Sequence, residues 1–262
     1  MVRMREYQKK NKCTTIENLT DTKAHHLLAN EREDILVFGS KSSLSYMSAT
    51  PLIFADGTFK CKLKDYSQLY IFHALVKNNV SLPMLFCLVK GKNGETYTRL
   101  LALIEELAAA SGKTVFNRPV SLMCDFEAPF IKAVREHYAS VEVKCCFFHF
   151  TKNLRDKARP VVNAIKNAAG KNSEKHQLAQ RTKRRLMTLP LLPRELITHE
   201  VVGLIHKAWV DVCPDHHGAF DEVIASFVET YIGTPHGIGA RPRFPSSLWC
   251  VSGLSVRTNN PA

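Results

Sequence analysis

The sequence predicts an α/β fold: a mixed sheet with helices on both faces, followed by a separate helical block. Two observations predict it. Apolar runs typical of strands occupy residues 52–59, 68–76 and 83–89, and two further strands alternate with helical spacing up to residue 148. From about residue 151 to residue 230 the pattern is almost wholly helical. The chain of 262 residues therefore predicts one large sheet domain with a sizeable helical insertion.

The elements follow in a clear order. Residues 35–38 form a short apolar run, residues 40–47 predict a helical turn, and the three strands with short connections predict an antiparallel meander. The sequence Lys77-Asn78-Asn79 supplies turn chemistry between the second and third strands. Helix, strand, helix and a fifth strand over residues 141–148 come next. The apolar positions that mark the two helices are Leu100, Leu103, Ile104 and Leu107, then Phe130, Ile131, Val134 and Tyr138.

This order, β-β-β-α-β-α-β with a basic helix after it, is that of the ribonuclease-H-like fold. In that arrangement the first and fourth strands are parallel neighbours. The expected organisation has four parts, which are a polar leader (residues 1–33), a ribonuclease-H-like core (34–150), a basic helical insertion (151–232) and a loop returning to the core (233–262). Pro190 and Pro193 interrupt the helical block, where Leu204, Ala208 and Val212 form one apolar face. Asn260 and Pro261 announce a final helix.

Two aspartates stand where apolar runs meet the edge of the predicted core. Asp56 interrupts the first strand, and Asp125 ends the fourth. The strand order places them together, and paired carboxylates suit Mg²⁺ or Mn²⁺ in a two-metal site for phosphoryl chemistry. Gly57 would leave room for a ligand, and Glu127 would share the face of Asp125 if the strand continued. Two simpler interpretations stay open: Asp125 as a helix N-cap, and Asp56 as part of an Asp-Gly turn.

A second candidate metal site begins at the end of the fifth strand. Cys146 and His149 have the Cys-x-x-His spacing and could supply half of a zinc site. Cys213 and His216 repeat that spacing and could supply the other half. The alternative is that Cys146 and His149 have a structural role, because a buried cysteine commonly serves as a small apolar residue.

The charge of the chain is concentrated in one segment. Of the net charge of +12, the stretch from Lys152 to Arg185 holds +9, because it has eleven Lys and Arg against two acidic residues. A solvated helical face is one interpretation, and a surface for a polyanion such as DNA is the other. The candidate DNA-binding residues are Lys152, Arg155, Lys157, Arg159, Lys183, Arg184 and Arg185.

The sequence also indicates a compartment. No segment is long and apolar enough for a membrane span, and the first ten residues have no apolar signal region. The eight cysteines are scattered, mostly within apolar runs, which is typical of a reducing compartment. We therefore expect an intracellular protein without a membrane partner, and a DNA partner would make it nuclear.

With these segments in place, the chain from about residue 35 onward resembles the transposase domain of Mutator-like elements, the MULE transposases of the DDE superfamily. Five pieces carry the resemblance in order: Ala55-Asp56-Gly57-Thr58-Phe59-Lys60, residues 68–74, Asp125-Phe126-Glu127-Ala128, Cys146-x-x-His149-Phe150 and Arg257-Thr258-Asn259-Asn260. The helical block also resembles the insertion that these enzymes carry. The resemblance implies a ribonuclease-H-like core, DNA strand cleavage and transfer at transposon ends and target DNA, and an Asp-Asp-Glu metal triad that begins with Asp56 and Asp125.

The third carboxylate of the triad is where this sequence departs from the family. In the family a glutamate follows about three residues after Thr-Asn-Asn, and this sequence ends at Ala262. Three hypotheses stay open: an enzyme fragment cut short of that glutamate, a decayed or host-adapted remnant that binds DNA without cutting it, or a purely structural domain that uses Cys146 and His149 for folding. The first two predict salt-dependent DNA binding without cleavage by the 262-residue chain. A homo-oligomer is compatible with these hypotheses, and we expect no small-molecule substrate.

Overall fold

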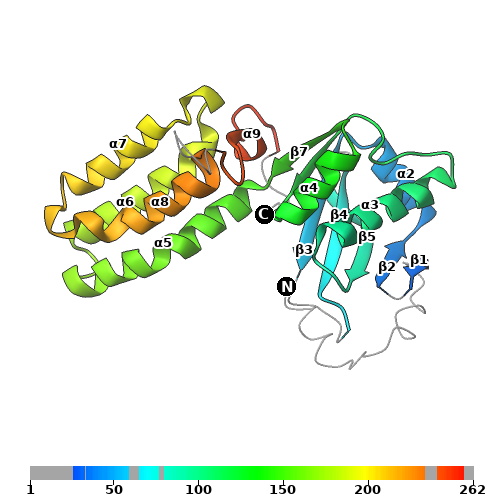
Figure 1. Cartoon of the computed structure of the whole chain (residues 1–262), viewed down its shortest axis with the longest axis horizontal. Helices are drawn as coiled ribbons and strands as arrows, with labels where there is room; N and C mark the ends of the chain where they lie inside the picture. Colours follow the sequence, from blue (N-terminus) through cyan, green and yellow to red (C-terminus); the bar gives the residue numbers. More distant parts are fainter. Residues whose placement is uncertain (1–25, 33, 59–64, 77–79, 234–240, 257–262) are drawn as a thin grey trace. The chain divides into compact units, whose positions relative to one another are not determined.

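The computed structural model describes residues 26–32, 34–58, 65–76, 80–233 and 241–256 (Figure 1). The first 25 residues of the expected leader lie outside this part, as do the turn at 77–79, much of the returning loop and the announced helix at Asn260. The chain divides into two compact units. The first unit comprises residues 1–122 and 129–143, and the second comprises residues 123–128 and 144–262.

Seven strands form one sheet in the order β1-β2-β5-β4-β3-β6-β7. Their bounds are β1 His26–Glu31, β2 Ile35–Gly39, β3 Leu52–Thr58, β4 Gln68–Val76, β5 Val80–Val89, β6 Val120–Cys124 and β7 Val141–Cys145. The pairs β1–β2, β2–β5, β5–β4 and β4–β3 are antiparallel. The first and fourth predicted strands, β3 and β6, are neighbours in this order. They begin side by side, since the N–H of Ser121 donates to the carbonyl of Pro51 at 3.0 Å.

The N-terminal edge of the sheet corrects the sequence-based organisation. The polar leader was expected to extend to residue 33, but His26–Glu31 forms strand β1 and pairs with β2. The predicted apolar run at residues 35–38 is the fully buried strand β2. Strand β2 also pairs with β5. Strands β1 and β2 therefore add two strands to the predicted meander at its β5 edge.

Among the described residues, the first unit has three helices: α2 Lys41–Ala49, α3 Gly94–Ala109 and α4 Ala128–His137 (Figure 1). One face of β4 carries the buried residues Gln68, Tyr70, Phe72 and Ala74. The Tyr70 ring lies 5.7 Å from Tyr97 of α3 and 4.9 Å from Phe130 of α4, centroid to centroid. Helices α3 and α4 therefore pack on this face and form the main core of the first unit.

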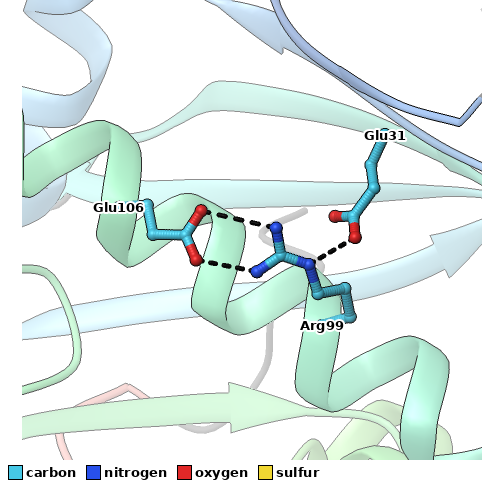
Figure 2. A network of polar contacts seen from close by, with 3 residues as sticks. All are labelled: Glu31, Arg99 and Glu106. Atoms are coloured by element: carbon cyan, nitrogen blue, oxygen red, sulfur yellow. Dashed lines mark hydrogen bonds and ion pairs between the residues drawn. The ribbon is translucent and has the colours of Figure 1, made fainter.

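Helix α3 is also tied to the sheet edge by Arg99 (Figure 2). Its guanidinium lies between two carboxylates, with 2.5 Å from Nε to Glu31 of β1 and 2.7 Å from Nη1 to Glu106, which is two turns further along α3. Both carboxylates hold the pKa of Arg99 above its ordinary value. Because the group is well exposed, we treat this network as orientation of β1 rather than as a large source of stability.

Two strand ends differ from the sequence-based bounds. Strand β6 stops at Cys124, so Asp125 follows the strand instead of ending it. Strand β7 stops at Cys145, and Phe147 already belongs to the next helix, whereas the sequence extended this strand to residue 148. Both segments are apolar, and an apolar run by itself does not distinguish a strand end from the first turn of a buried helix.

The second unit is helical (Figure 1). Its longer helices are α5 Phe147–Ala169, α6 Glu174–Thr188, α7 His199–Val210 and α8 Asp221–Phe227, and its short elements are η3 Leu189–Leu191, η4 Arg194–Leu196, η5 Pro214–Phe220, η6 Val228–Ile232 and α9 Ser246–Trp249. Helix α5 ends at Gly170, which has φ +92°, and α6 begins at Ser173, whose hydroxyl accepts from the N–H of His176. Pro160 lies inside α5, where it cannot donate to the carbonyl of Asp156.

Helix α7 buries a different side from the apolar face noted in the sequence. Val202, Ile205 and Trp209 are buried, whereas Leu204 is 64% exposed. Val212, beyond the end of the helix, is also exposed. Both sets have helical spacing, and packing against α6 and α8 selects the one that contains Trp209, the largest side chain available.

Aromatic side chains fill the core of the second unit beside α5. The Phe150 ring stacks on Trp249 at 5.0 Å and lies 4.9 Å from Tyr231. Phe126, from the short segment between β6 and α4, lies 5.7 Å from Tyr231 and 5.1 Å from Phe244, edge to face in both cases. These contacts explain why residues 123–128 belong to the second unit rather than to the predicted sheet domain.

Candidate functional site

Asp56 lies within β3 and is half-buried. It is paired with Ile71 of β4, so both side chains lie on the face opposite the one that α3 and α4 cover. Gly57 is paired with Tyr70, so a side chain at position 57 would lie on the face that α3 and α4 cover. A side chain added there would meet Gln68 Oε1 and the Tyr70 ring, both at 3.3 Å. The glycine therefore makes room for core residues of β4, which corrects the prediction that it opens the backbone to a ligand.

His73 is a second functional group on the face of Asp56. It is paired with Phe54, two residues before Asp56 on the same strand face. Burial lowers the pKa of His73, and the carboxylate of Asp56 acts in the opposite direction. His73 had no role predicted from the sequence; its alternation with the buried Phe72 and Ala74 puts it on the less buried face of the strand.

Asp125 follows β6 directly and is half-buried. Its neighbour Phe126 is held in the aromatic core of the second unit, where it also lies 6.1 Å from Phe150 of α5. Phe126 therefore fixes the backbone that carries Asp125. Glu127 lies in the loop after the strand, so the expectation that it shares a strand face with Asp125 fails because the strand ends at Cys124.

The thiols near Asp125 serve the core. The Cys124 thiol is fully buried, and a hydrogen bond with Cys145 together with burial raises its pKa well above the ordinary value. Cys146 is also buried, and its N–H donates to the carbonyl of Cys124 at 2.7 Å. This bond joins the end of β6 to the first turn of α5. Protonated, buried thiols of this kind pack like small apolar groups.

The predicted zinc residues can be placed only in part. Cys146 precedes α5, and His149 lies in its first turn, with the ring 5.4 Å from Phe148. Cys213 is buried before η5, and the side chain of His216 lies outside the described part of the chain. Within the described ranges, no three or more His, Cys, Asp or Glu side chains form a group that could hold a metal ion.

The basic segment forms helices α5 and α6, which pack against each other. On α5, one side carries a series that we call the α5 stripe. Its members recur at helical intervals and are exposed: Phe148, Lys152, Arg155, Arg159 and Lys166. Lys157 is exposed on another side of the helix. The structure thus groups three of the four predicted DNA-binding residues of α5 and separates the fourth.

Helix α6 adds cations next to the α5 stripe. Burial lowers the pKa of Lys183, and the positive charges of Arg184 and Arg155 lower it further. Arg155 of α5 therefore lies close enough to Lys183 of α6 for mutual repulsion. In the described part of the chain, four exposed or half-buried cations form no ion pair with a carboxylate: Arg155, Lys183, Arg184 and Arg185. Asp156, which lies beside the stripe on α5, forms ion pairs with two of its members, Lys152 at 3.5 Å and Arg159. Uncompensated cations of this density favour a polyanionic ligand.

Comparison with known proteins finds a similarity to one family in the middle of the chain. The model of the MULE transposase domain matches residues 52–153, the segment from β3 to the first two turns of α5, which contains Asp56, His73, Asp125, Cys146 and His149. A comparison with curated proteins finds no match. No helix among the described residues is long and apolar enough to cross a membrane.

Proposed function

We infer from the MULE transposase domain at residues 52–153 that this chain is a DNA transposase domain, and we propose that it breaks and joins DNA phosphodiester bonds. The family match is the observation that carries the proposal. It confirms the resemblance found in the sequence, and it spans both predicted catalytic aspartates. The strand order β5-β4-β3-β6-β7 supports assigning the sheet to the ribonuclease-H-like class.

Asp56 and Asp125 are the proposed metal-binding carboxylates. Their strands begin side by side at Pro51 and Ser121, and each aspartate follows four to five residues later. Two carboxylates fit Mg²⁺ or Mn²⁺, which also take water and phosphate oxygens as ligands. When bound, such ions stabilise the charge on the attacking and leaving oxygens of a phosphodiester. His73 lies on the same strand face as Asp56 and would act as a positioning residue for it.

The basic residues of α5 and α6 are the proposed contacts to the DNA backbone. Lys152, Arg155 and Arg159 lie on one side of α5, and Lys183 and Arg184 add to it from α6. Phosphate contacts of this kind fix the position of DNA without reading its sequence. A nuclear location would follow from this partner.

The metal assignment is tested by titrating Mn²⁺ into the 262-residue chain in a calorimeter. Asp56→Asn and Asp125→Asn are each expected to weaken Mn²⁺ binding about tenfold or more, because each removes one carboxylate ligand. Asp65→Asn is the matched control, since Asp65 is an exposed carboxylate of the first unit outside the strands. Wild-type affinity in both aspartate variants would overturn the assignment.

The DNA assignment is tested by measuring duplex affinity against salt concentration. Replacing Arg155, Lys183 and Arg184 together by Ala is expected to reduce the slope of log K against log salt by roughly 2 to 3, about 0.9 for each phosphate that the protein no longer neutralises. The triple Ala variant of Lys41, Lys113 and Arg135, which are exposed cations of the first unit, serves as the control. An unchanged slope in the α5–α6 variant would place the DNA surface elsewhere. DNA binding without Mn²⁺ binding would favour a non-catalytic remnant.

A further inference from the structure

Phe148 is the one member of the α5 stripe that carries no charge. Its side chain is 39% exposed in the first turn of α5, and its ring meets the ring of His149 nearly at a right angle (82°). Phe150, two residues on, points to the opposite side and is fully buried in the aromatic core. An aromatic ring left at the surface of so basic a helix is not required by the packing of that helix.

The positions that follow Phe148 give this ring its chemical context. Lys152 lies one turn along the same side, and Arg155 and Arg159 follow at helical intervals. From Phe148 to Arg159 the stripe extends about 16 Å along the helix axis. A flat ring followed by a row of cations matches what binds single-stranded nucleic acid, where bases stack on aromatic side chains and basic groups follow the phosphates.

The aromatic end of the stripe is also the end next to Asp125. The N–H of Cys146 holds the start of α5 to the carbonyl of Cys124, the residue before Asp125. Phe126 and Phe150 bring the same two segments together from the other side, 6.1 Å apart. A strand that lies along α5 therefore has its stacked base nearest to the proposed metal carboxylate and its further phosphates progressively more distant.

We propose that Phe148 stacks on an unpaired DNA base beside the phosphate at Asp125, while Lys152, Arg155 and Arg159 bind phosphates of the same strand. The proposal rests on the proposed transposase function and adds a preference for a frayed or single-stranded DNA end over an intact duplex. A protein partner fits less well, because the exposed ring is single and its neighbours on the stripe are all cations.

The test compares two DNA ligands of equal length by fluorescence anisotropy: a blunt duplex, and a duplex with a short single-stranded overhang that carries 2-aminopurine. The wild-type chain is expected to bind the overhang DNA more tightly and to quench its 2-aminopurine. Phe148→Ala is expected to lose about tenfold in overhang affinity and most of the quenching, with blunt-duplex affinity unchanged. Phe148→Trp should retain both signals.

Tyr46→Ala is the matched control, because Tyr46 is an exposed aromatic residue on α2, outside the basic helices. Circular dichroism of each variant verifies that its helices are intact. Equal affinity of the wild-type chain for both ligands would overturn the stacking role and leave the transposase function standing. An equal loss on both ligands in Phe148→Ala would overturn it as well. Failure of the wild-type chain to bind either DNA would overturn the proposed function itself.

Discussion

At the scale of single residues, His73 and Asp56 lie on the same face of the sheet, and this position affects the pKa of His73. An imidazole that is partly removed from water resists protonation, and a nearby carboxylate opposes this effect. The pKa of His73 lies below its ordinary value of 6.5, so burial outweighs the attraction of Asp56. The balance between the two effects is a property of the fold around β3 and β4.

We predict that Asp56→Asn lowers the pKa of His73 further, because it removes the charge that stabilises the imidazolium. A ¹H–¹⁵N NMR titration of the imidazole measures this directly, and Asp65→Asn should leave the pKa of His73 as it is. The sign for stability follows. The unfolded chain takes up the His73 proton at higher pH than the folded chain, so the free energy of unfolding decreases as pH falls below about 6.5, towards the lowered pKa. His73→Gln should flatten that decrease, and an unaltered His73 pKa in Asp56→Asn would contradict the pairing.

The sequence singled out the two aspartates as candidates because each marks the edge of an apolar run, which is a local signal. It could not assign Gly57, His73 or Glu127 in the same way. The role of Gly57 depends on Gln68 and Tyr70 across the sheet, and that of His73 depends on the register between β3 and β4. The position of Glu127 depends on where β6 ends, and strand ends are poorly marked in the sequence.

At the scale of elements, strands with nearly continuous apolar runs could be predicted from the sequence. Which side of an amphipathic helix is buried could not. Strand β4 has the predicted bounds, residues 68–76, because apolar residues fill most of that run. Strand β1 was missed because His26–Glu31 ends in polar residues and is stabilised by pairing with β2 rather than by its own pattern. Helix α7 offered two apolar sides, and only the tertiary packing chose between them.

This choice leads to a prediction for α7. Ile205→Ala should lower the free energy of unfolding by about 2 to 5 kcal/mol, because it leaves a cavity in the core of the second unit. Leu204→Ala should change it by less than about 0.5 kcal/mol, because that side chain is mostly in water. Urea unfolding followed by circular dichroism compares the two neighbours. A cost for Leu204→Ala equal to that of Ile205→Ala would mean that another surface covers Leu204.

At the scale of the whole molecule, the chain passes between its two units three times, after residues 122, 128 and 143. The sequence placed the boundary between the sheet core and the helical insertion at residue 150, because the pattern becomes helical and basic after it. The short segment 123–128 is assigned to the second unit by Phe126, whose partners Tyr231 and Phe244 lie more than a hundred residues away in the sequence. Such distant partners cannot be read from local pattern.

We therefore predict that Phe126→Ala destabilises the second unit by about 2 kcal/mol, less than a fully buried phenylalanine would because Phe126 is half-buried. The same variant should weaken Mn²⁺ binding, since the backbone of Asp125 loses its anchor. Phe126→Leu, which keeps most of the apolar volume, should show smaller effects on both. Thermal unfolding and Mn²⁺ titration provide the measurements, and stability loss without any change in Mn²⁺ binding would separate Asp125 from this anchor.

Pro160 removes a backbone hydrogen bond from the middle of the long helix α5. A 23-residue helix with every backbone hydrogen bond in place is a stiff rod, but the missing donor at position 160 removes one hydrogen bond in its middle. This gap lies between Asp156 and Pro160, at the end of the segment that carries Phe148, Lys152, Arg155 and Arg159, and Lys166 follows beyond it. In the proposed complex, a DNA strand that continued from Arg159 to Lys166 would therefore cross the part of α5 that a missing backbone hydrogen bond weakens, where a helix bends most easily.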